Sequence, residues 1–212
     1  MLVDEAMRKK LLAEEFKLRK KQPTAWTKAK YRKYAVFMSR KKENENARKK
    51  LTIVGAGRVG SSAAWLSAVK GLGDIVLVNR TENTAKGIAL DISQSLPVEK
   101  QDISVIGTSD YAETKDSDVI IITAGAPRTA GAFGTREQLI ETNSVVVKDV
   151  VRNVARLSQQ AVMIVVTNPL DAMVAVAAKQ SEYPKKKVLG MAGILDSARF
   201  ASFIAEALSV SV

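Results

Sequence analysis

The stretch Leu-Thr-Ile-Val-Gly-Ala-Gly-Arg-Val-Gly, residues 51–60, decides the fold of this chain. Residues 51–54 predict a short buried strand, and residues 58–70 predict a helix with an apolar face. Three glycines join them in a G-x-G-x-x-G spacing: Gly55, Gly57 and Gly60. A strand, a tight glycine turn and a helix in this order are typical of a dinucleotide-binding fingerprint.

Each glycine of this motif has its own physical task. Gly55 permits the sharp turn, Gly57 lets the backbone approach a pyrophosphate, and Gly60 lets helix and strand pack closely. The helix start, at Arg58 and Val59, offers free N–H groups and a partial positive charge to phosphates. The alternative is a strand–turn–helix unit of the same shape that holds no ligand.

The composition limits the chemistry of the chain. Its 212 residues have room for one domain of ordinary size and an appendage. The chain has no Cys, which excludes disulfides and thiolate metal sites, and we predict no metal site. It also has no His, the usual general base near neutral pH. No apolar run reaches the length of a transmembrane helix, and we expect the cytoplasm or the mitochondrial matrix as the compartment.

The positive charge is concentrated in the first quarter of the chain. Residues 1–50 hold 17 of the 33 Lys and Arg but only 6 of the 22 Asp and Glu, so the whole net charge of +11 lies there. Residues 51–212 are neutral as a whole. We therefore predict a basic extension and linker over 1–50 and a dinucleotide-binding domain over 51–212.

The extension predicts two helices and a linker. Residues 1–22 and about 24–40 have helical spacings, and residues 39–50 are almost wholly polar. Basic residues alternate with aromatic ones, which suits RNA or a ribonucleoprotein surface; the candidates are Trp26, Lys28, Lys30, Tyr31, Arg32, Lys33, Tyr34 and Arg40. A solvated tail, an anionic membrane surface and an import segment are the alternatives.

From residue 51 onward, short apolar runs alternate with helical patterns. Strands are predicted at 75–78, 103–106, 119–123, 161–166 and 188–191, and helices at 84–95, 136–158, 170–180 and 195–208. This alternation predicts an α/β fold with a doubly wound, mainly parallel sheet of the Rossmann type. Ligands bind at the carboxyl ends of such strands, where the candidates besides the glycine turn are Asn79, Thr123, Ala124, Gly125, Val166, Thr167 and Asn168.

Asn79 leaves the choice of dinucleotide open. It lies 19 residues after Gly60, where an acidic side chain usually accepts hydrogen bonds from the adenosine ribose of NAD. An amide bonds a hydroxyl without repelling a 2′-phosphate, and the neighbouring Arg80 would attract one. We expect NAD as the cofactor, with NADP as the alternative.

Residues 51–212 resemble the lactate/malate dehydrogenase family, and its malate dehydrogenase branch most closely. The matching segments are Gly-Ala-Gly-Arg-Val-Gly (55–60), Gly-Ile-Ala-Leu-Asp (87–91), Ile-Thr-Ala-Gly-Ala-Pro-Arg (122–128), Thr-Arg-Glu-Gln-Leu (135–139), Thr-Asn-Pro-Leu-Asp (167–171) and Leu-Asp-Ser-Ala-Arg-Phe (195–200). The last segment is highly specific.

The resemblance implies a set of arginines for an anionic dicarboxylate. Arg128 matches the residue that pairs with the distal carboxylate of the substrate, and Arg136 matches the one that polarises its carbonyl. Arg199 matches the arginine that grips the carboxylate next to the reacting carbon. Three unconnected surface cations are the alternative interpretation.

The resemblance also implies roles for three other side chains. Asp196 matches the carboxylate that orients the catalytic histidine, and Asn143 and Asn168 match residues that contact the nicotinamide ribose and the substrate. The histidine of the family lies downstream of Arg199 and has no counterpart here. Further departures are Asn79, Ala201 and a longer loop around 132–134.

Three functions remain open from the sequence. The first is the cofactor domain of a malate dehydrogenase, which would be inactive alone. The second is a dehydrogenase-like subunit of a large assembly such as an organellar ribosome, docked on RNA or protein through residues 1–50. The third is a nucleotide sensor, which needs the cleft and no chemistry. We also expect a partner to cover the surface that a substrate domain would bury.

Overall fold

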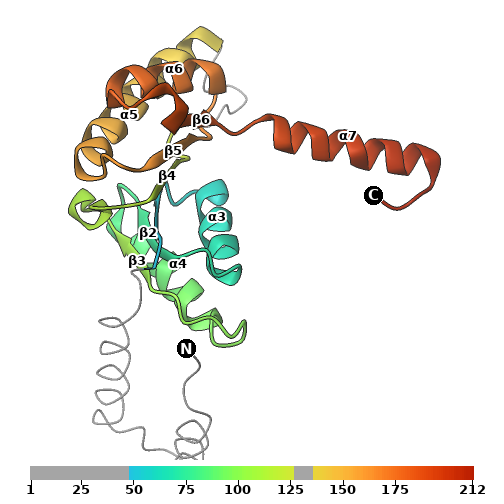
Figure 1. Cartoon of the computed structure of the whole chain (residues 1–212), viewed down its shortest axis with the longest axis horizontal. Coiled ribbons are helices and arrows are strands. Elements are labelled where there is room, and N and C mark those ends of the chain that lie inside the picture. Colours follow the sequence, from blue (N-terminus) through green and yellow to red (C-terminus); the bar gives the residue numbers. More distant parts are fainter. Residues whose placement is uncertain (1–47, 127–135) are drawn as a thin grey trace, which may run out of the picture. The chain divides into compact units, whose positions relative to one another are not determined.

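Six parallel strands form one sheet in the computed structural model, in the order β3-β2-β1-β4-β5-β6 (Figure 1). The strands are β1 (Lys50–Val54), β2 (Asp74–Val78), β3 (Val105–Thr108), β4 (Val119–Ile122), β5 (Val162–Val165) and β6 (Val188–Gly190). The strand order reverses between β1 and β4, which places the switch point beside the glycine turn. The predicted doubly wound parallel fold is confirmed.

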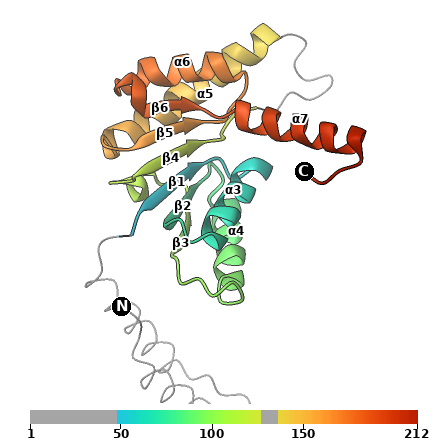
Figure 2. The same ribbon diagram turned by 45° about the vertical axis from the view of Figure 1, so that its right-hand side comes forward.

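Helices cover both faces of the sheet (Figure 2). Helices α3 (Arg58–Val69) and α4 (Glu82–Ser95) cover one face, and α5 (Arg136–Leu157) and α6 (Leu170–Ser181) cover the other. Helix α7 (Gly193–Leu208) follows β6, and two short 3₁₀ turns are η1 (Tyr111–Thr114) and η2 (Lys185–Lys187). The structure describes residues 48–126 and 136–212. The predicted helices and nucleic-acid side chains of the extension lie outside the described residues.

Alternating strand residues divide the core into two halves. Ile53 packs with Leu77 and the apolar faces of α3 and α4, whereas Val54 packs with Val78 and the faces of α5 and α6. All four side chains are at most 3% exposed. This alternation is what a parallel sheet covered on both faces requires.

The third strand begins two residues later than predicted, at Val105 instead of Ile103. The Asp74 carboxylate accepts the N–H of Ser104 at 2.9 Å, and the ladder with β2 starts at the next residue. The strand then continues through Gly107, where a Cβ would lie 2.1 Å from the carbonyl oxygen of Ala85. Close packing of α4 against β3 therefore sets the register.

The end of the predicted linker is also corrected, because β1 begins at Lys50. Arg48 donates to the carbonyl and the carboxylate of Asp102, at 2.8 and 2.7 Å. Lys49 Nζ and the Lys50 N–H both donate to the Asp118 carboxylate, at 2.8 and 2.9 Å. These two bonds lower the pKa of Asp118. The amino end of β1 is thus held to its neighbours by charge.

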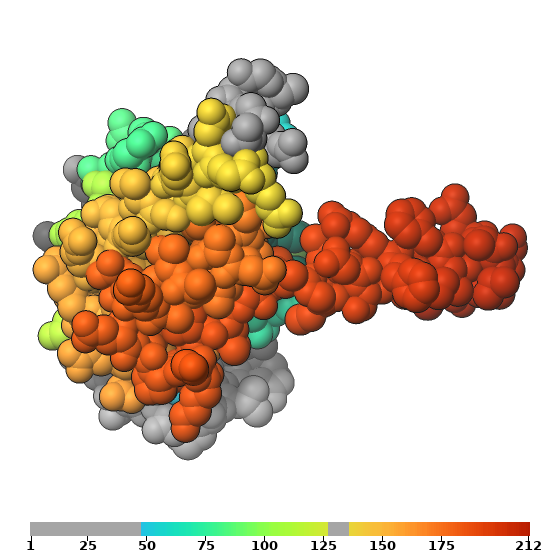
Figure 3. Space-filling model, turned by 90° about the horizontal axis from the view of Figure 1, so that it is seen from above, coloured from blue at the N-terminus to red at the C-terminus, as the bar shows by residue number. Residues whose placement is uncertain are grey.

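Helix α7 extends away from the sheet layers (Figure 3). Of its residues only Ala205 is buried. Its large apolar side chains are exposed: Ile194, Leu195, Phe200, Phe203, Ile204 and Leu208. Among the described residues, no helix is long and apolar enough to cross a membrane, and no group of three or more acidic side chains is placed to hold a metal ion.

Candidate cofactor-binding site

The glycine turn connects β1 to α3 at the carboxyl edge of the sheet. Gly55 has φ of +109° and donates its N–H to the Val78 carbonyl at 2.8 Å. A Cβ on Gly55 would lie 2.7 Å from the Ala124 nitrogen. Left-handed backbone and close packing together require glycine here. The sharp turn predicted for this residue is present.

The space beside the exposed Gly57, named the notch here, is open. A Cβ on this residue would meet nothing within 4 Å, and its φ of −81° is an ordinary one. The first bond of the helix ladder runs from Ser61 N–H to the Gly57 carbonyl at 2.8 Å. Among the described residues, none accepts a hydrogen bond from the amides of Arg58, Val59 or Gly60. Free amides at a helix start beside empty space form an anion-binding arrangement.

Gly60 explains why the helix starts so close to the strand. A Cβ there would lie 1.8 Å from the Gly55 carbonyl oxygen and 2.7 Å from Thr123 Oγ1. No side chain larger than hydrogen fits between helix and turn. The amino end of α3 is therefore held directly over the notch, with its partial positive charge directed at the open space.

Asn79 follows β2 at the same edge, and its amide is oriented by two backbone groups. Its Oδ1 accepts the N–H of Ala56 at 3.3 Å, and its Nδ2 donates to the Thr81 carbonyl at 3.2 Å. Arg80 beside it is exposed. The side chain predicted to meet the adenosine ribose therefore contacts the glycine turn itself.

The end of β4 supports the turn from the other side. Thr123 Oγ1 donates to the carbonyls of Gly55 and Val54, at 2.9 and 3.2 Å. The Thr167 hydroxyl, at the end of β5, donates to the Ala124 carbonyl at 2.8 Å. Three strand ends are thus joined through two hydroxyls, and the predicted cofactor residues are brought to one edge. The sequence alone gave no sign of these anchoring bonds.

Asn143 is buried in α5 at 1% exposure. Its Oδ1 accepts the Ala126 N–H at 2.7 Å, and its Nδ2 donates to the carbonyls of Ala126 and Asn168, at 3.2 and 2.6 Å. The side chain holds the loops after β4 and β5 together. Its contact with a nicotinamide ribose stays a prediction. An asparagine four residues after Leu139 and four before Val147, both buried, is the sequence signal of this clamp.

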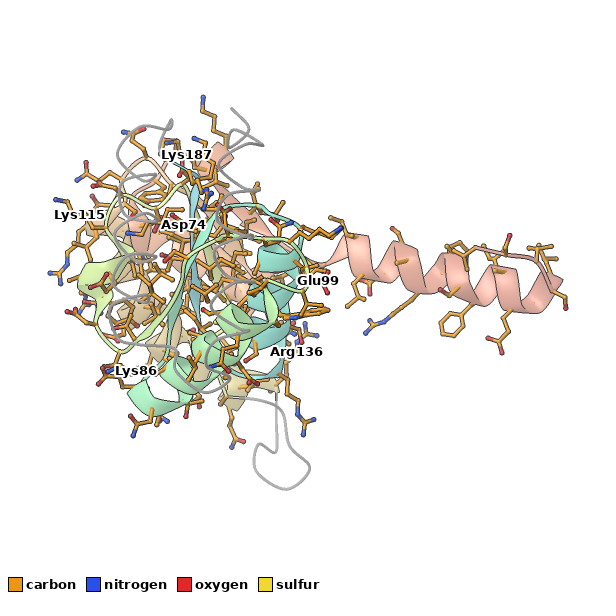
Figure 4. The ribbon with its side chains drawn as sticks, turned by 90° about the horizontal axis from the view of Figure 1, so that it is seen from below. Asp74, Lys86, Glu99, Lys115, Arg136 and Lys187 are labelled. Carbon is orange, nitrogen blue, oxygen red and sulfur yellow. The ribbon has the colours of Figure 1, made fainter. Side chains whose placement is uncertain are left out.

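The residues predicted to bind substrate are only partly described. Arg136 is the first residue of α5 and is exposed (Figure 4). Asn168 is also exposed, at the edge beside Thr167. Arg128 and the longer loop at 132–134 lie outside the described residues.

Asp196 and Arg199 lie together on α7. Their Oδ1 and Nη1 atoms are 3.4 Å apart, and their side chains are 71% and 61% exposed. Within the described part of the chain, each has no other ion-pair partner. Among the described residues, no hydrogen bond or ion pair joins either side chain to the glycine turn, so their predicted roles stay predictions. An exposed pair of this kind contributes little to stability.

The notch and its free amides fit a dinucleotide pyrophosphate, and comparison with known proteins identifies the family. Residues 49–190 match the model of the lactate/malate dehydrogenase NAD-binding domain. The chain belongs to the lactate/malate dehydrogenase family. Residues 49–190 are the NAD-binding domain of this family, and NAD is the cofactor that the domain binds. The predicted resemblance and the predicted cofactor are confirmed.

The relatives extend well beyond this domain. Malate dehydrogenase from Symbiobacterium thermophilum is 49% identical over 166 residues, 77% of this chain and 52% of that protein. The Bacillus thuringiensis malate dehydrogenase is 47% identical over 167 residues, 78% of this chain and 53% of that protein. The chain therefore spans about half the length of these dehydrogenase relatives.

Solved dehydrogenase structures share the fold. The Salinibacter ruber malate dehydrogenase superposes with a TM-score of 0.70 at 42% identity, covering 76% of this chain and 50% of that one. The Cryptosporidium parvum lactate dehydrogenase, solved with lactic acid and nicotinamide adenine dinucleotide, gives 0.74 at 38% identity, covering 79% and 52%.

Proposed function

We propose that this chain supplies the cofactor-binding half of a malate dehydrogenase. The observation that carries the proposal is the open notch at Gly57, with the free amides of Arg58, Val59 and Gly60 on its wall. When bound, the nicotinamide cofactor takes up or gives the hydride. The chain's own residues hold the pyrophosphate at the notch and set the ribose contact through Asn79.

The substrate and the proton acceptor belong to the proposal as well. Arginines suit a dicarboxylate because their forked donors pair with carboxylates through two bonds, and Arg136 lies at the carboxyl edge of the sheet. The 212 residues contain no histidine. We therefore propose that malate is the substrate and that the base comes from outside these residues.

Calorimetric titration of the full chain with NAD tests the proposal. We expect saturable binding of one NAD per chain and no malate-dependent reduction of NAD by the chain alone. Missing acid–base catalysis costs about 10²–10⁴-fold in rate. Absence of NAD binding would refute the proposal, and turnover by the chain alone would refute its account of the base.

Replacing Asn79 by aspartate should shift the preference toward NAD by about 10-fold or more. The Oδ1 position that accepts the Ala56 N–H is kept, and the new charge repels a 2′-phosphate. Titrations with NAD and NADP give the ratio of affinities. Asn83→Asp is the matched control, because Asn83 is exposed in the first turn of α4. An unchanged ratio in Asn79→Asp would contradict the assignment.

We further propose that a polypeptide equivalent to the second half of the dehydrogenase relatives covers α7. Phe200 and Phe203 are 67% and 66% exposed, and Ile194 is 80% exposed. Exposed apolar surface of this kind marks interaction sites. About half the length of the relative lies outside the matched region, and this unmatched half is the polypeptide that we propose covers α7.

The double change Phe200→Ser/Phe203→Ser should abolish this association. The probe is the separately produced second half of the Symbiobacterium thermophilum relative, mixed with the full chain and followed by light scattering. Leu90→Ser/Val98→Ser removes two exposed apolar side chains elsewhere and should leave binding unchanged. If the unaltered chain does not associate with this second half, the proposal that such a polypeptide covers α7 is refuted.

RNA binding through residues 1–50 is the second candidate function. It is supported by the 17 Lys and Arg against 6 Asp and Glu in that segment. Binding should fall by about 100-fold or more between about 50 and 200 mM salt, because phosphate contacts release counterions. Fluorescence anisotropy with a single-stranded RNA measures it. The candidate fails if binding is insensitive to salt or persists without residues 1–47.

A further inference from the structure

A polar groove lies at the edge of the sheet opposite the cofactor notch. It has a volume of about 470 Å³ and is formed by the carboxyl ends of α5 and α6 with the segments that follow them. Arg152, Arg156, Gln159, Gln180 and Tyr183 line it. Lys187 of the adjoining η2 and Arg136 at the start of α5 lie toward opposite ends of the domain (Figure 4). The groove is therefore separate from the dinucleotide site.

The α5 wall presents hydrogen-bond donors with few partners. Arg152 and Arg156 are four residues apart, so both lie on one face of the helix. Among the described residues, Arg152 makes no hydrogen bond or ion pair, and Arg156 makes one bond, to Asn153 Oδ1 at 3.3 Å. Both side chains line the groove and are free to bind an acceptor from outside.

The acceptors at the same helix end already have partners. The Tyr183 hydroxyl donates to the Ser158 carbonyl, and burial raises the pKa of this hydroxyl, so it keeps its proton. Lys187 Nζ donates to the carbonyl and the Oε1 of Gln160, at 2.8 and 3.1 Å. These contacts satisfy carbonyls at the negative end of the helix dipole. The groove keeps a surplus of donors over acceptors.

Further positive charge surrounds the groove. Lys185 and Lys186 follow Pro184, which lines it, and within the described part of the chain neither has an ion-pair partner. Glu182 is the single acidic side chain of the lining. Arginine forks and amide donors together match the oxygen atoms of a phosphate group.

We propose that this groove binds a small phosphate-bearing anion, independently of the dinucleotide at the opposite edge. Arg152 and Arg156 hold the phosphate oxygens by charged hydrogen bonds, and Gln159 and Gln180 add neutral donors. Glu182 opposes the same anion and limits its affinity.

Titration of the ¹⁵N-labelled full chain with inorganic pyrophosphate tests the proposal residue by residue. Binding in the groove should shift the amide resonances of residues 180–183, whereas binding at the glycine turn shifts those of 57–60, and binding to the extension shifts those before 48. Absence of shifts at 180–183 up to about 10 mM pyrophosphate would overturn the proposal.

Matched variants separate the groove from general charge effects. Arg152→Gln/Arg156→Gln should weaken the binding read at residues 180–183 by about 10-fold or more. Lys70→Gln/Lys100→Gln removes the same charge from two exposed lysines, which follow α3 and α4, and should change it less than about 2-fold. Glu182→Gln should tighten binding. Equal weakening by the two double variants would overturn the proposal.

ADP in place of pyrophosphate distinguishes the two sources of a diphosphate. Equal affinity, read at the same residues, assigns the groove to the diphosphate alone. Tighter binding of ADP adds a contact to the nucleoside, and Tyr183 is the aromatic side chain in the lining that is placed to supply it. Both outcomes support a phosphate-binding groove. If pyrophosphate binds in the groove but ADP does not, the proposal that the groove takes the phosphate end of a larger molecule is overturned.

Discussion

Replacing Gly57 by valine should weaken NAD binding by about 100-fold or more while leaving the fold intact. The new side chain would stand in the notch, where a Cβ meets nothing within 4 Å, and would occupy the space needed by the pyrophosphate. The φ of −81° suits valine, so folding costs little. A loss of about 2.7 kcal/mol corresponds to the expected 100-fold change.

Calorimetry and thermal unfolding together measure this result. Gly87→Val is the matched control, because a Cβ there also meets nothing within 4 Å and Gly87 lies within α4, away from the notch. The control should bind NAD like the unaltered chain. If Gly57→Val binds NAD with unchanged affinity, the pyrophosphate does not lie against this turn.

Replacing Gly60 by alanine, a smaller change in the same motif, should instead destabilise the fold. Gly60→Ala places a Cβ 1.8 Å from the Gly55 carbonyl oxygen and 2.7 Å from Thr123 Oγ1, both held by the turn. Overpacking of this kind costs about 1–3 kcal/mol, and an overlap with backbone lies at the upper end. Alanine recovers about 1 kcal/mol of helix propensity at most, so we expect a net loss of about 2 kcal/mol or more.

Urea denaturation of Gly60→Ala beside Gly57→Ala isolates the effect. Both variants add one methyl group to the same motif, three residues apart. The Gly57 variant should unfold at the same urea concentration as the unaltered chain, because its methyl group meets open space. Equal midpoints for both variants would show that the helix and the turn separate easily, contrary to the packing described here.

The fold could be predicted from the sequence because the apolar runs, the helical spacings and the glycine motif all indicated the same alternation of strands and helices. Apolar runs such as Ile75–Val78 are fully buried strands, and the glycine spacing predicted both the turn and the crossover. The third strand was displaced because its register depends on the Asp74 carboxylate and on the close approach of α4 to Gly107. Both are contacts between distant segments, and no local pattern reports them.

The candidate site could be predicted only as a set of strand ends. Spacing indicated that Asn79 and Thr123 would lie at one edge, but their hydrogen bonds to the glycine turn depend on the folded geometry. The polar residues over 39–50 suggested a linker, and the acidic partners of its last three residues lie far away in sequence. Long-range charge pairing is what a single-sequence pattern cannot supply.

The hydroxyl of Thr123 has a consequence for recognition. By donating to the carbonyls of both Val54 and Gly55, it fixes the glycine turn against the neighbouring strand. Because the turn is already held in place in the unliganded protein, binding a dinucleotide costs little further loss of loop entropy. Removing that one hydroxyl should therefore lower the affinity for the dinucleotide by loosening the unliganded turn. The effect is expected even though the hydroxyl bonds only backbone carbonyls in the described structure.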